Sequence, residues 1–423
     1  MNEACDVIVI GGGSAGIVAA IQAGRAGAKT LLVEKYGILG GTTTMAHVNF
    51  PGIFFAWGRQ VVAGIGWELV EATLSEADEP LPDMNQPKHW QRHVRVNMAL
   101  FAALSDRALC DAGVELRLHT MIAAAARAED GWTVTLCTKT GLTDVHCKVL
   151  IDGTGDANAV QLAGLKVNRH QPMQPGSILF TVGGYDPDRL DLDALDRAWS
   201  GAVAEGRFRE SDLGWGKQRL RRFLRGGGGN CTHVCGIDGA TSEGKTAADL
   251  AGRDLMLRLF RFLKAQRGLE GLKITSLAPE CGIRETVTIR GKATISSQDY
   301  TSGRVWPDAV CYSFYPIDVH TADGDGVDFR PLADGVVATI PRGAMLPADS
   351  RFLIAAGRHI AGDRLAHSAY RTQATCMATG QAAGAMAALS AQSGIDPEEL
   401  DIERVRALLC EHGAIVPEMG SPT

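Results

Sequence analysis

The chain has 423 residues, of which 45% are hydrophobic and 21% are charged, and its formal net charge is -6. These values are typical of a globular protein with two or three domains, and the mild negative charge gives no general attraction to nucleic acid or to an anionic membrane. No apolar run reaches the roughly 18 residues of a membrane span, and the first apolar strand begins almost at the N-terminus. We therefore expect a cytoplasmic protein without a signal peptide, with its ten cysteines reduced.

Residues 6–34 have the pattern of a unit that binds a dinucleotide. An apolar strand leads into Gly11, Gly13 and Gly16, which match the spacing G-x-G-x-x-G, and an alanine-rich helix follows. The first glycine allows the tight turn, the second lets the backbone approach a pyrophosphate, and the third lets the helix pack closely on the sheet. Glu34 ends the next apolar run, near the offset at which a carboxylate binds a ribose hydroxyl. This unit alone does not distinguish FAD from NAD.

Residues 35–44 form a second glycine-rich loop, in which Gly37, Gly40 and Gly41 are followed by three threonines. Such a loop can wrap a second phosphate or a ribityl chain, and nicotinamide-binding domains do not require it, so it favours FAD. His47 comes next and is the one group in its segment that titrates near neutral pH. It is a candidate for contact with flavin or substrate, with packing and a covalent link to FAD as alternatives.

The following part of the chain predicts a helix and then several strands. Apolar residues recur at helical spacing over residues 94–109. Strands are expected at residues 114–118, 132–136 and 145–151, with glycine turns between the later ones. The last strand runs into residues 152–156, Asp-Gly-Thr-Gly-Asp, a turn of small residues that can bring backbone close to the cofactor.

The character of the sequence changes over residues 166–345, where glycine-rich and charged loops separate moderate strands such as residues 177–182. Residues 246–266 predict a long amphipathic helix with Leu250 and Leu257 among its apolar positions. We expect this segment to be an inserted domain.

Two features of that segment resemble binding motifs without completing one. The basic residues 217–225 precede four glycines at residues 226–229, but no strand precedes these glycines, so they do not form a phosphate loop. The basic run can meet an acidic partner or RNA, although a solvated helix face is favoured. Cys231 and Cys235, with His233 between them, lack the second pair that a four-ligand metal site needs, so we expect no metal.

The C-terminal part returns to the pattern of the N-terminal part. Residues 351–357 are a strand that runs into Gly357, and residues 375–389 predict a helix of small residues with Gly380 and Gly384. Small residues let this helix approach the cofactor closely, with its N-terminus facing an anionic flavin oxygen.

Together these elements predict an α/β fold in two domains. A Rossmann-like FAD-binding domain of the glutathione-reductase kind is discontinuous and comprises residues 1–165 and 346–423, and an inserted α+β substrate or cap domain comprises residues 166–345. No second G-x-G-x-x-G follows a strand, so we expect no separate NADPH domain.

Once the two ends are considered together, the chain resembles the FAD-dependent oxidoreductase family that carries a Gly-Ile-Arg-Glu-Thr signature, present here at residues 282–286. Further blocks that look like this family are residues 49–58, 238–241, 340–342 and 356–384. Val287 and Thr288 depart from it, because the family usually has a basic pair there. Within the signature, we expect Arg284 and Glu285 to form a structural ion pair.

A more distant similarity is to the flavoproteins of succinate dehydrogenase and fumarate reductase. By that analogy Arg364 faces the substrate and binds a carboxylate or a developing oxyanion, for which the rigid fork of a guanidinium is suited. Arg358 stands where those proteins have a glutamate near the ribityl chain, so that contact must differ.

Residue candidates follow from these motifs. The catalytic candidates are Arg364, His320, His367, His47 and Arg371, with His320 as a carrier of protons. The cofactor-binding candidates are Gly11, Gly13, Ser14, Ala15, Gly16, Glu34, Lys35, Gly40, Gly41, Thr42, Ile122, Gly153, Thr154, Gly155, Asp156, Gly357, Arg358, Thr375 and Cys376.

We therefore expect an FAD-dependent dehydrogenase or reductase that transfers a hydride between flavin N5 and a small polar or carboxylate-bearing organic substrate. A flavin monooxygenase is one alternative. A flavoprotein subunit of a larger complex, or a partner in RNA modification, is another. The partner we expect is a small molecule, with neither nucleic acid nor membrane, and the sequence leaves a homo-oligomer open.

Overall fold

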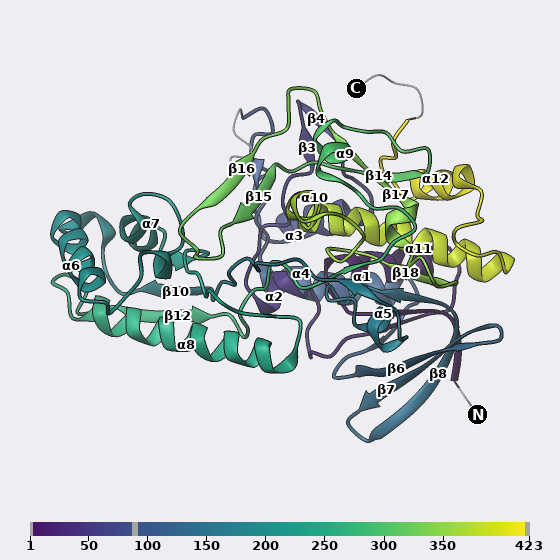
Figure 1. The fold of residues 1–423 in the computed structure, drawn as a ribbon, viewed down its shortest axis with the longest axis horizontal. Coiled ribbons are helices and arrows are strands. Elements are labelled where there is room, and N and C mark those ends of the chain that lie inside the picture. Colours follow the sequence, from purple (N-terminus) through teal and green to yellow (C-terminus); the bar gives the residue numbers. More distant parts are fainter. Residues whose placement is uncertain (1–2, 87–91, 419–423) are drawn as a thin grey trace.

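The structure is a computed structural model, and it describes residues 3–86 and 92–418. Within these residues the largest sheet has seven strands in the order β5-β2-β1-β8-β7-β6, and β18 pairs with β8 (Figure 1). Its strands are β1 (Glu3–Ile10), β2 (Thr30–Val33), β5 (Glu115–Arg117), β6 (Met121–Ala128), β7 (Gly131–Thr138), β8 (Gly141–Asp152) and β18 (Leu353–Ala355). β1 is parallel to β2 and β8, whereas β6, β7 and β8 form an antiparallel meander.

The parallel strands end together at one edge of this sheet. Ile10 at the end of β1 pairs in register with Val33 of β2 and with Asp152 of β8. This register brings the glycine turn after β1 next to the turn after β8. A site built from both turns follows directly from the pairing, as is usual at the carboxyl edge of a parallel sheet.

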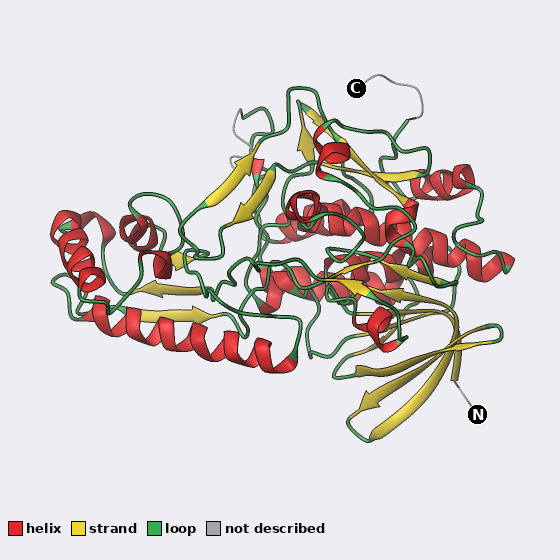
Figure 2. Cartoon of the chain, viewed as in Figure 1, coloured by secondary structure: helices red, strands yellow, loops and turns green. Residues whose placement is uncertain are grey.

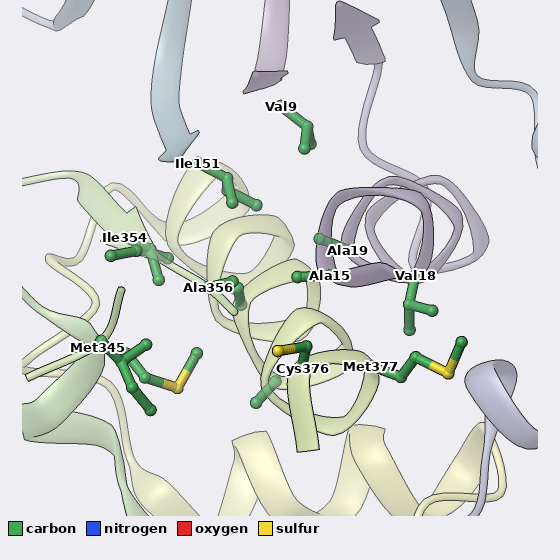
Figure 3. Close-up of a cluster of buried hydrophobic side chains, with 14 of the residues drawn as sticks. Val9, Ala15, Val18, Ala19, Ile151, Met345, Ile354, Ala356, Cys376 and Met377 are labelled. Atoms are coloured by element: carbon green, nitrogen blue, oxygen red, sulfur yellow. The ribbon is translucent and has the colours of Figure 1, made fainter. Parts of the chain in front are cut away.

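Two helices from opposite ends of the chain pack against each other beside this sheet: α1 (Ser14–Arg25) and α11 (Gln373–Ser393). A Cβ atom on Gly380 would lie 2.2 Å from the carbonyl oxygen of Ala15, and one on Gly384 would lie 2.2 Å from that of Ala19. Figure 3 shows Ala15 and Ala19 on the side of α1 that faces α11, with Cys376 from α11 nearby. Gly380 and Gly384 are thus required by the contact with α1, and the expected approach of this helix to the cofactor stays a prediction.

A second hydrophobic core lies apart from the first, at the left of Figure 1. It is built on a sheet of β10 (Phe180–Gly183), β11 (Gly228–Gly229) and β12 (Lys273–Leu277), with β10 in the middle. Three helices pack with this sheet: α6 (Leu192–Ala204), α7 (Arg219–Arg225) and α8 (Ser242–Lys264) (Figure 2). Phe180, Phe223 and Leu259 are among its fully buried side chains.

Helix α8 spans residues 242–264 instead of the predicted 246–266, and Leu250 and Leu257 do not lie on its buried face. It begins at residue 242 because the side chain of Thr241 caps it by accepting a hydrogen bond from the Gly244 N–H. Leu250 and Leu257 are 59% and 38% exposed, whereas Leu259 is buried. The apolar stripe of α8 is wider than the face that the second core covers, so the periodicity alone selected residues at its solvent-exposed margin.

Residues 287–345 belong by packing to the first core and not to the second. Their buried side chains include Val287, Tyr300 and Ile340. Short antiparallel pairs join this part: β9 (Val167–Asn168) with β13 (Thr288–Ile289), β14 (Ala309–Ser313) with β17 (Ala338–Pro341), and β15 (Ile317–His320) with β16 (Val327–Arg330). The packing therefore differs from the expected division at residue 345, since β9 and β13 return the chain to the first core near residue 287.

The remaining elements are short or peripheral. They are α2 (Thr42–Met45), α3 (Ile65–Glu76), α4 (Met98–Asp111), α5 (Asn158–Leu162), α9 (Ser297–Thr301), α10 (Arg364–Tyr370), α12 (Ile402–Glu411), and the pair β3 (Phe55–Ala56) and β4 (Arg59–Gln60). Helix α4 begins at residue 98, later than expected, because Asn97 caps its first turn. In the described parts of the chain, no helix combines the length and hydropathy needed to cross a membrane.

The contact between α1 and α11 predicts unequal effects of two similar substitutions. Gly380→Ala should destabilise the protein by about 1–3 kcal/mol, because its new methyl group overlaps the backbone of α1. Gly201→Ala in α6 is the control: nothing lies within 4 Å of its added Cβ, and alanine favours the helix by up to about 1 kcal/mol. Thermal unfolding of the two variants tests this, and equal melting temperatures would contradict the packing argument.

Candidate functional site

The three glycines after β1 differ in the space that surrounds each of them. Gly11 has a φ of +99°, and a Cβ there would lie 2.7 Å from the carbonyl oxygen of Gly153. A Cβ on Gly16 would lie 1.7 Å from the carbonyl oxygen of Gly11. On Gly13 a Cβ would meet only the Cα of Gly41, at 3.9 Å. Gly11 and Gly16 are thus required by the fold, whereas Gly13 borders open space that suits a pyrophosphate.

The first turn of α1 faces this space. Gly13 is its N-cap and supplies no capping side chain, so the first N–H groups are available to an anion. The Ser14 hydroxyl donates to the Gln373 side chain at 3.2 Å. A Cβ on Gly357, where φ is +103°, would lie 3.2 Å from the Cβ of Ala15. The beginning of α1 is therefore framed by two segments from the far end of the chain.

The second glycine loop lies directly against the first. The Gly40 N–H donates to the carbonyl oxygen of Gly12 at 2.9 Å, and Gly13 and Gly40 form a parallel bridge. Gly41 has a φ of +52°, and a Cβ there would lie 2.9 Å from the Cα of Gly13. Thr42 begins α2, for which Gly41 is an N-cap without a capping side chain. The two loops make one glycine cradle, and the wrapping of a second phosphate or the ribityl chain by the second loop stays a prediction.

Glu34 lies at the end of β2 with its carboxylate turned to the cradle. It accepts hydrogen bonds from the N–H groups of Gly12, at 2.6 Å, and Tyr36, at 2.9 Å. Burial raises the pKa of Glu34, while these two donors oppose the rise. Each oxygen keeps a further acceptor position, so the carboxylate can still accept from ribose hydroxyls.

Two predicted cofactor residues lie at the border of this region. Lys35 is exposed, with its ammonium 4.9 Å from the centre of the Tyr36 ring. Ile122 on β6 is half-buried, and the N–H of Thr120 just before it donates to the Glu34 carbonyl at 3.0 Å. Both residues lie on the Glu34 side of the cradle, where the adenosine half is expected.

The turn after β8 backs the first glycine loop. Asp152 is fully buried and accepts from the Thr154 N–H at 3.0 Å and from its hydroxyl at 2.7 Å. The Gly153 N–H donates to Ile10 at 2.8 Å. These bonds fix the turn whose backbone contacts Gly11.

Arg358 ties this turn to the Gly-Ile-Arg-Glu-Thr segment. Its guanidinium donates to the carbonyl oxygens of Gly155, at 2.7 Å, and Ile283, and to the carboxylate of Asp156 at 2.6 Å. The Thr286 hydroxyl also donates to Asp156, at 2.9 Å. Burial works against ionisation of Asp156, but Arg358 holds the pKa of that carboxyl below its usual value. The Arg358 guanidinium thus has protein partners, in contrast to the direct contact with the cofactor that the sequence predicts.

Gln373 at the start of α11 joins both glycine loops, and sequence reasoning missed it. Its amide oxygen accepts from Thr43 at 2.6 Å as well as from Ser14, and its amide nitrogen donates to Val48 at 2.8 Å. His47, which precedes that carbonyl, is half-buried with a φ of +56°, and burial lowers its pKa. The available signal in the sequence was a glutamine just before the helix of small residues predicted at residues 375–389.

Thr375 and Cys376 direct their side chains to protein partners. The Thr375 hydroxyl bonds with that of Ser313 on β14 at 2.9 Å, and the Cys376 thiol donates to the Arg371 carbonyl at 3.4 Å. Their predicted contact with the cofactor stays a prediction.

The expected ion pair between Arg284 and Glu285 is wrong, because Glu285 pairs with Arg364. The Arg364 guanidinium lies 3.3 Å from Glu285, which also accepts from the main-chain and side-chain amides of Gln174 at 2.6 and 2.9 Å. Neighbouring residues of an extended segment point to opposite sides, which separates the two members of the expected pair. Arg364 thus lies at the site with its charge already compensated.

Arg284 and Arg371 carry the uncompensated charge of the region. Arg284 donates to the Pro175 carbonyl and, at 3.1 Å, to the Ser177 hydroxyl. Burial and then the charge of Arg371 lower the pKa of Arg284 to about 10. Arg371 donates to the Asp318 carbonyl at 3.2 Å, and its buried Nε has no partner in the described residues. Neither guanidinium has a carboxylate within 4 Å among residues 3–86 and 92–418.

Two histidines lie beside these arginines. His320, at the end of β15, donates its N–H to Gln174 at 3.0 Å, and its Nε2 lies 3.7 Å from an Asp318 carboxylate oxygen. The ring of His233 lies 5.1 Å from it, and Trp215 stacks on His233 at 5.3 Å. Burial lowers the pKa of His233 to about 3 and that of His320 further. The sequence presented His233 only as a candidate metal ligand.

His367 occupies a different environment. It is 1% exposed on α10, packs edge-to-face on Tyr370 at 5.6 Å, and burial lowers its pKa well below the usual value. The structure thus brings Arg364, Arg371 and His320 to one region, and His367 also lies near enough to Arg371 for that charge to lower its pKa.

The basic helix α7 uses its arginines within the protein. Arg221 contacts Asp193 and Asp196 of α6, and Arg219 lies 2.9 Å from Asp325. Nowhere in the described residues do three or more His, Cys, Asp or Glu side chains gather as ligands for a metal ion.

The open side of Gly13 leads to a prediction on binding. Gly13→Ala should weaken FAD binding at least tenfold, because its methyl group enters the cradle without touching the protein. Fluorescence quenching of added FAD measures this, and the melting temperature of the FAD-free protein should stay within about a degree of the original. Unchanged affinity would show that the cradle is not where the phosphates bind.

The pKa of His233 leads to a prediction on acid stability. Because its pKa is lowered on folding, the unfolded chain binds more protons between pH 6.5 and about 3, so stability is lost as the pH falls through this range, by up to ~1.4 kcal/mol per pH unit. His233→Asn keeps a donor for the Gly324 carbonyl but does not titrate. Its melting temperature should fall less steeply than that of the original protein between pH 6.5 and 4.5. Parallel curves would contradict a neutral His233.

Comparison with known proteins completes the description. The sequence matches the family described as FAD dependent oxidoreductase over residues 6–409. Among solved structures, a geranylgeranyl bacteriochlorophyll reductase-like protein from Thermoplasma acidophilum is 14% identical, with 97% of this chain and 84% of that chain covered and a TM-score of 0.44. The anhydrotetracycline hydroxylase OxyS from Streptomyces rimosus is 20% identical, with 43% and 38% covered and a TM-score of 0.32. The aligned part spans well under two thirds of the hydroxylase, and these likenesses identify no substrate.

The family match covers nearly the whole chain, and the glycine cradle, the Glu34 carboxylate and the uncapped first turn of α1 suit a dinucleotide. The protein belongs to the FAD dependent oxidoreductase family: it is an enzyme, and its cofactor is FAD.

Proposed function

We propose that the protein is a dehydrogenase or reductase that acts on a small polar or carboxylate-bearing organic substrate, bound where the two hydrophobic cores meet. The observation that carries this proposal is the ring of His320. It is 3% exposed, and its Nδ1 is buried without a partner in the described part of the chain. Its Nε2 faces the carboxylate of Asp318. A buried imidazole backed by a carboxylate is suited to exchange a proton with a substrate.

When bound, FAD supplies two-electron chemistry by taking a hydride from a substrate or giving one to it. Oxidation of an alcohol or amine also releases a proton, and reduction of a double bond consumes one. His320 is neutral at physiological pH because burial, Arg284 and Arg371 lower its pKa. With Nε2–H directed to Asp318, the Nδ1 lone pair can take the proton of a substrate hydroxyl or amine. Arg364 is held by Glu285 and so positions this side of the site.

The residues that hold the cofactor in this proposal are those of the cradle. Gly13, Ser14 and Ala15 offer N–H groups and open space to the phosphates, and Glu34 accepts from a ribose. Membership of the group with the Gly-Ile-Arg-Glu-Thr signature is supported by the bonds of Ile283, Glu285 and Thr286 described above. The second core is proposed to be a cap over the substrate.

The other candidate functions have less support in the geometry. A monooxygenase and a subunit that works only in a complex with RNA stay as outcomes of the test. The arginines of α7 that contact Asp193, Asp196 and Asp325 have partners within the protein, which favours a small-molecule partner over nucleic acid.

A screen of metabolites under anaerobic conditions tests the proposal through bleaching of the flavin absorbance. A substrate of the proposed kind should bleach it without oxygen, and His320→Gln should slow the bleaching by about 10²–10⁴-fold while FAD stays bound. His146→Gln is the control, since that side chain on β8 lies beside Asp130 at the surface. Bleaching at the original rate in His320→Gln would remove His320 from the reaction. Substrate turnover that always requires oxygen together with an external reductant would indicate the monooxygenase.

A further inference from the structure

The boundary between the two cores encloses more positive charge than its acidic groups neutralise. Of three guanidiniums there, Arg364 has Glu285 within 4 Å, whereas no ion pair is formed by Arg284 or Arg371 in the described residues. The Asp318 carboxylate approaches only His320 within that distance, and Arg371 bonds to its carbonyl instead. Two half-buried cationic side chains thus share one region in which Asp318 is the nearby carboxylate and no carboxylate of the described residues lies within 4 Å of either guanidinium.

Such an arrangement is costly in the absence of a ligand. Removing a cation from water without a paired anion is unfavourable, and the lowered pKa of Arg284 reflects that cost. A bound anion supplies the missing charge. Guanidinium groups present fixed donors that match the two oxygens of a carboxylate, and the Nε of Arg371 is a buried donor with no described partner.

The same region contains two unused hydrogen-bond acceptors. His233 is 2% exposed, and its Nδ1 bonds to the Gly324 carbonyl at 2.8 Å. A carbonyl only accepts, so Nδ1 carries the proton and the neutral ring leaves Nε2 as a bare acceptor, buried without a partner among the described residues. His320 presents its Nδ1 in the same condition.

Arg284, Arg371 and His320 lie close together because the residues that bind them are near one another in the sequence. Arg284 is anchored on the Pro175 carbonyl, and the His320 N–H is anchored on the side chain of Gln174. Arg371 is anchored on Asp318, two residues before His320. A ligand that satisfies both sets therefore needs its donor on an atom close to its carboxylate.

We propose that Arg284 and Arg371 bind the carboxylate of the substrate and that the single proton of a hydroxyl on the adjacent carbon is shared by Nε2 of His233 and Nδ1 of His320 in a three-centre hydrogen bond, so that the substrate is a 2-hydroxy carboxylate. This rests on the proposed function and names its substrate class. A carboxylate without the hydroxyl leaves the buried acceptors unsatisfied and should therefore bind at least tenfold more weakly. A 2-amino carboxylate is disfavoured because its ammonium is repelled by the two arginines.

The test uses the purified protein with its FAD, without oxygen and at constant ionic strength. Calorimetric titration compares malate with succinate and lactate with propionate, since each pair differs only by the hydroxyl, and includes aspartate and alanine. At least one hydroxy acid should bind tenfold or more tightly than its deoxy partner and its amino analogue. Trp215 fluorescence is a second readout, because this ring stacks on His233.

Variants assign the two parts of the ligand to their residues. Arg371→Gln and Arg284→Lys should each weaken binding of the hydroxy acid and of its deoxy partner at least tenfold. His233→Phe, which keeps a ring against Trp215 but removes one of the two acceptors, should reduce the advantage of the hydroxy acid and leave binding of the deoxy acid unchanged. Arg330→Gln is the control, because that side chain is exposed on β16, the neighbour of β15. FAD content and melting temperature verify folding, and if Arg284→Lys fails to fold, Arg371→Gln decides.

Each result has a defined meaning. Equal binding of hydroxy and deoxy acids, tighter binding of amino acids, or unchanged binding in Arg371→Gln would overturn the inference. Binding that follows the prediction but never bleaches the flavin supports the site and counts against the proposed dehydrogenase. Anaerobic bleaching by a substrate without a carboxylate supports the dehydrogenase and overturns the inference.

Discussion

The contact between α1 and α11 is the interaction on which both halves of the site depend. It joins segments from opposite ends of the chain, and at Gly380 and Gly384 the helices approach until the backbone of α1 occupies the place of a side chain. This proximity places Gln373 between Ser14 and Thr43, so the two glycine loops and the start of α11 form one rigid unit. The position of Arg371 follows too, because it lies two residues before α11. A shift of α11 along α1 would displace cradle and cations together.

The Gly-Ile-Arg-Glu-Thr segment connects the turn after β8 with the region around Gln174 and His320. Ile283 and Thr286 contact Arg358 and Asp156 beside the turn after β8. Arg284 and Glu285 instead face Pro175 and Gln174, on the side of His320. Four of these five residues therefore contact either the turn after β8 or the region around Gln174, and each bond fixes the extended backbone that carries the next side chain. This gives the segment a physical role without requiring any of its residues to react.

The parts that could be predicted from the sequence are those with local causes. The turn after β1 was predictable because the required positive φ and close approaches restrict Gly11 and Gly16 to glycine. Strand β6 was not, since its run of alanines has little strand preference and is extended because β7 pairs with it. The pairing of Arg364 with Glu285 depends on topology that no local pattern contains. His233 was noticed only for its cysteine neighbours, because its contact with His320 exists only after the second core has formed.

The order in which the buried groups lose charge explains how one site can hold arginines and a base. Even with its pKa lowered to about 10, Arg284 stays protonated near neutrality. The two histidines beside it are therefore the groups that become neutral. This makes His320 a weak base, because burial, Arg284 and Arg371 oppose its protonation. An anion bound between the arginines cancels that repulsion and raises the pKa of His320 toward its ordinary value. The site would then gain a proton acceptor of useful strength only when a substrate of the right charge is in place, which links recognition to chemistry through electrostatics alone.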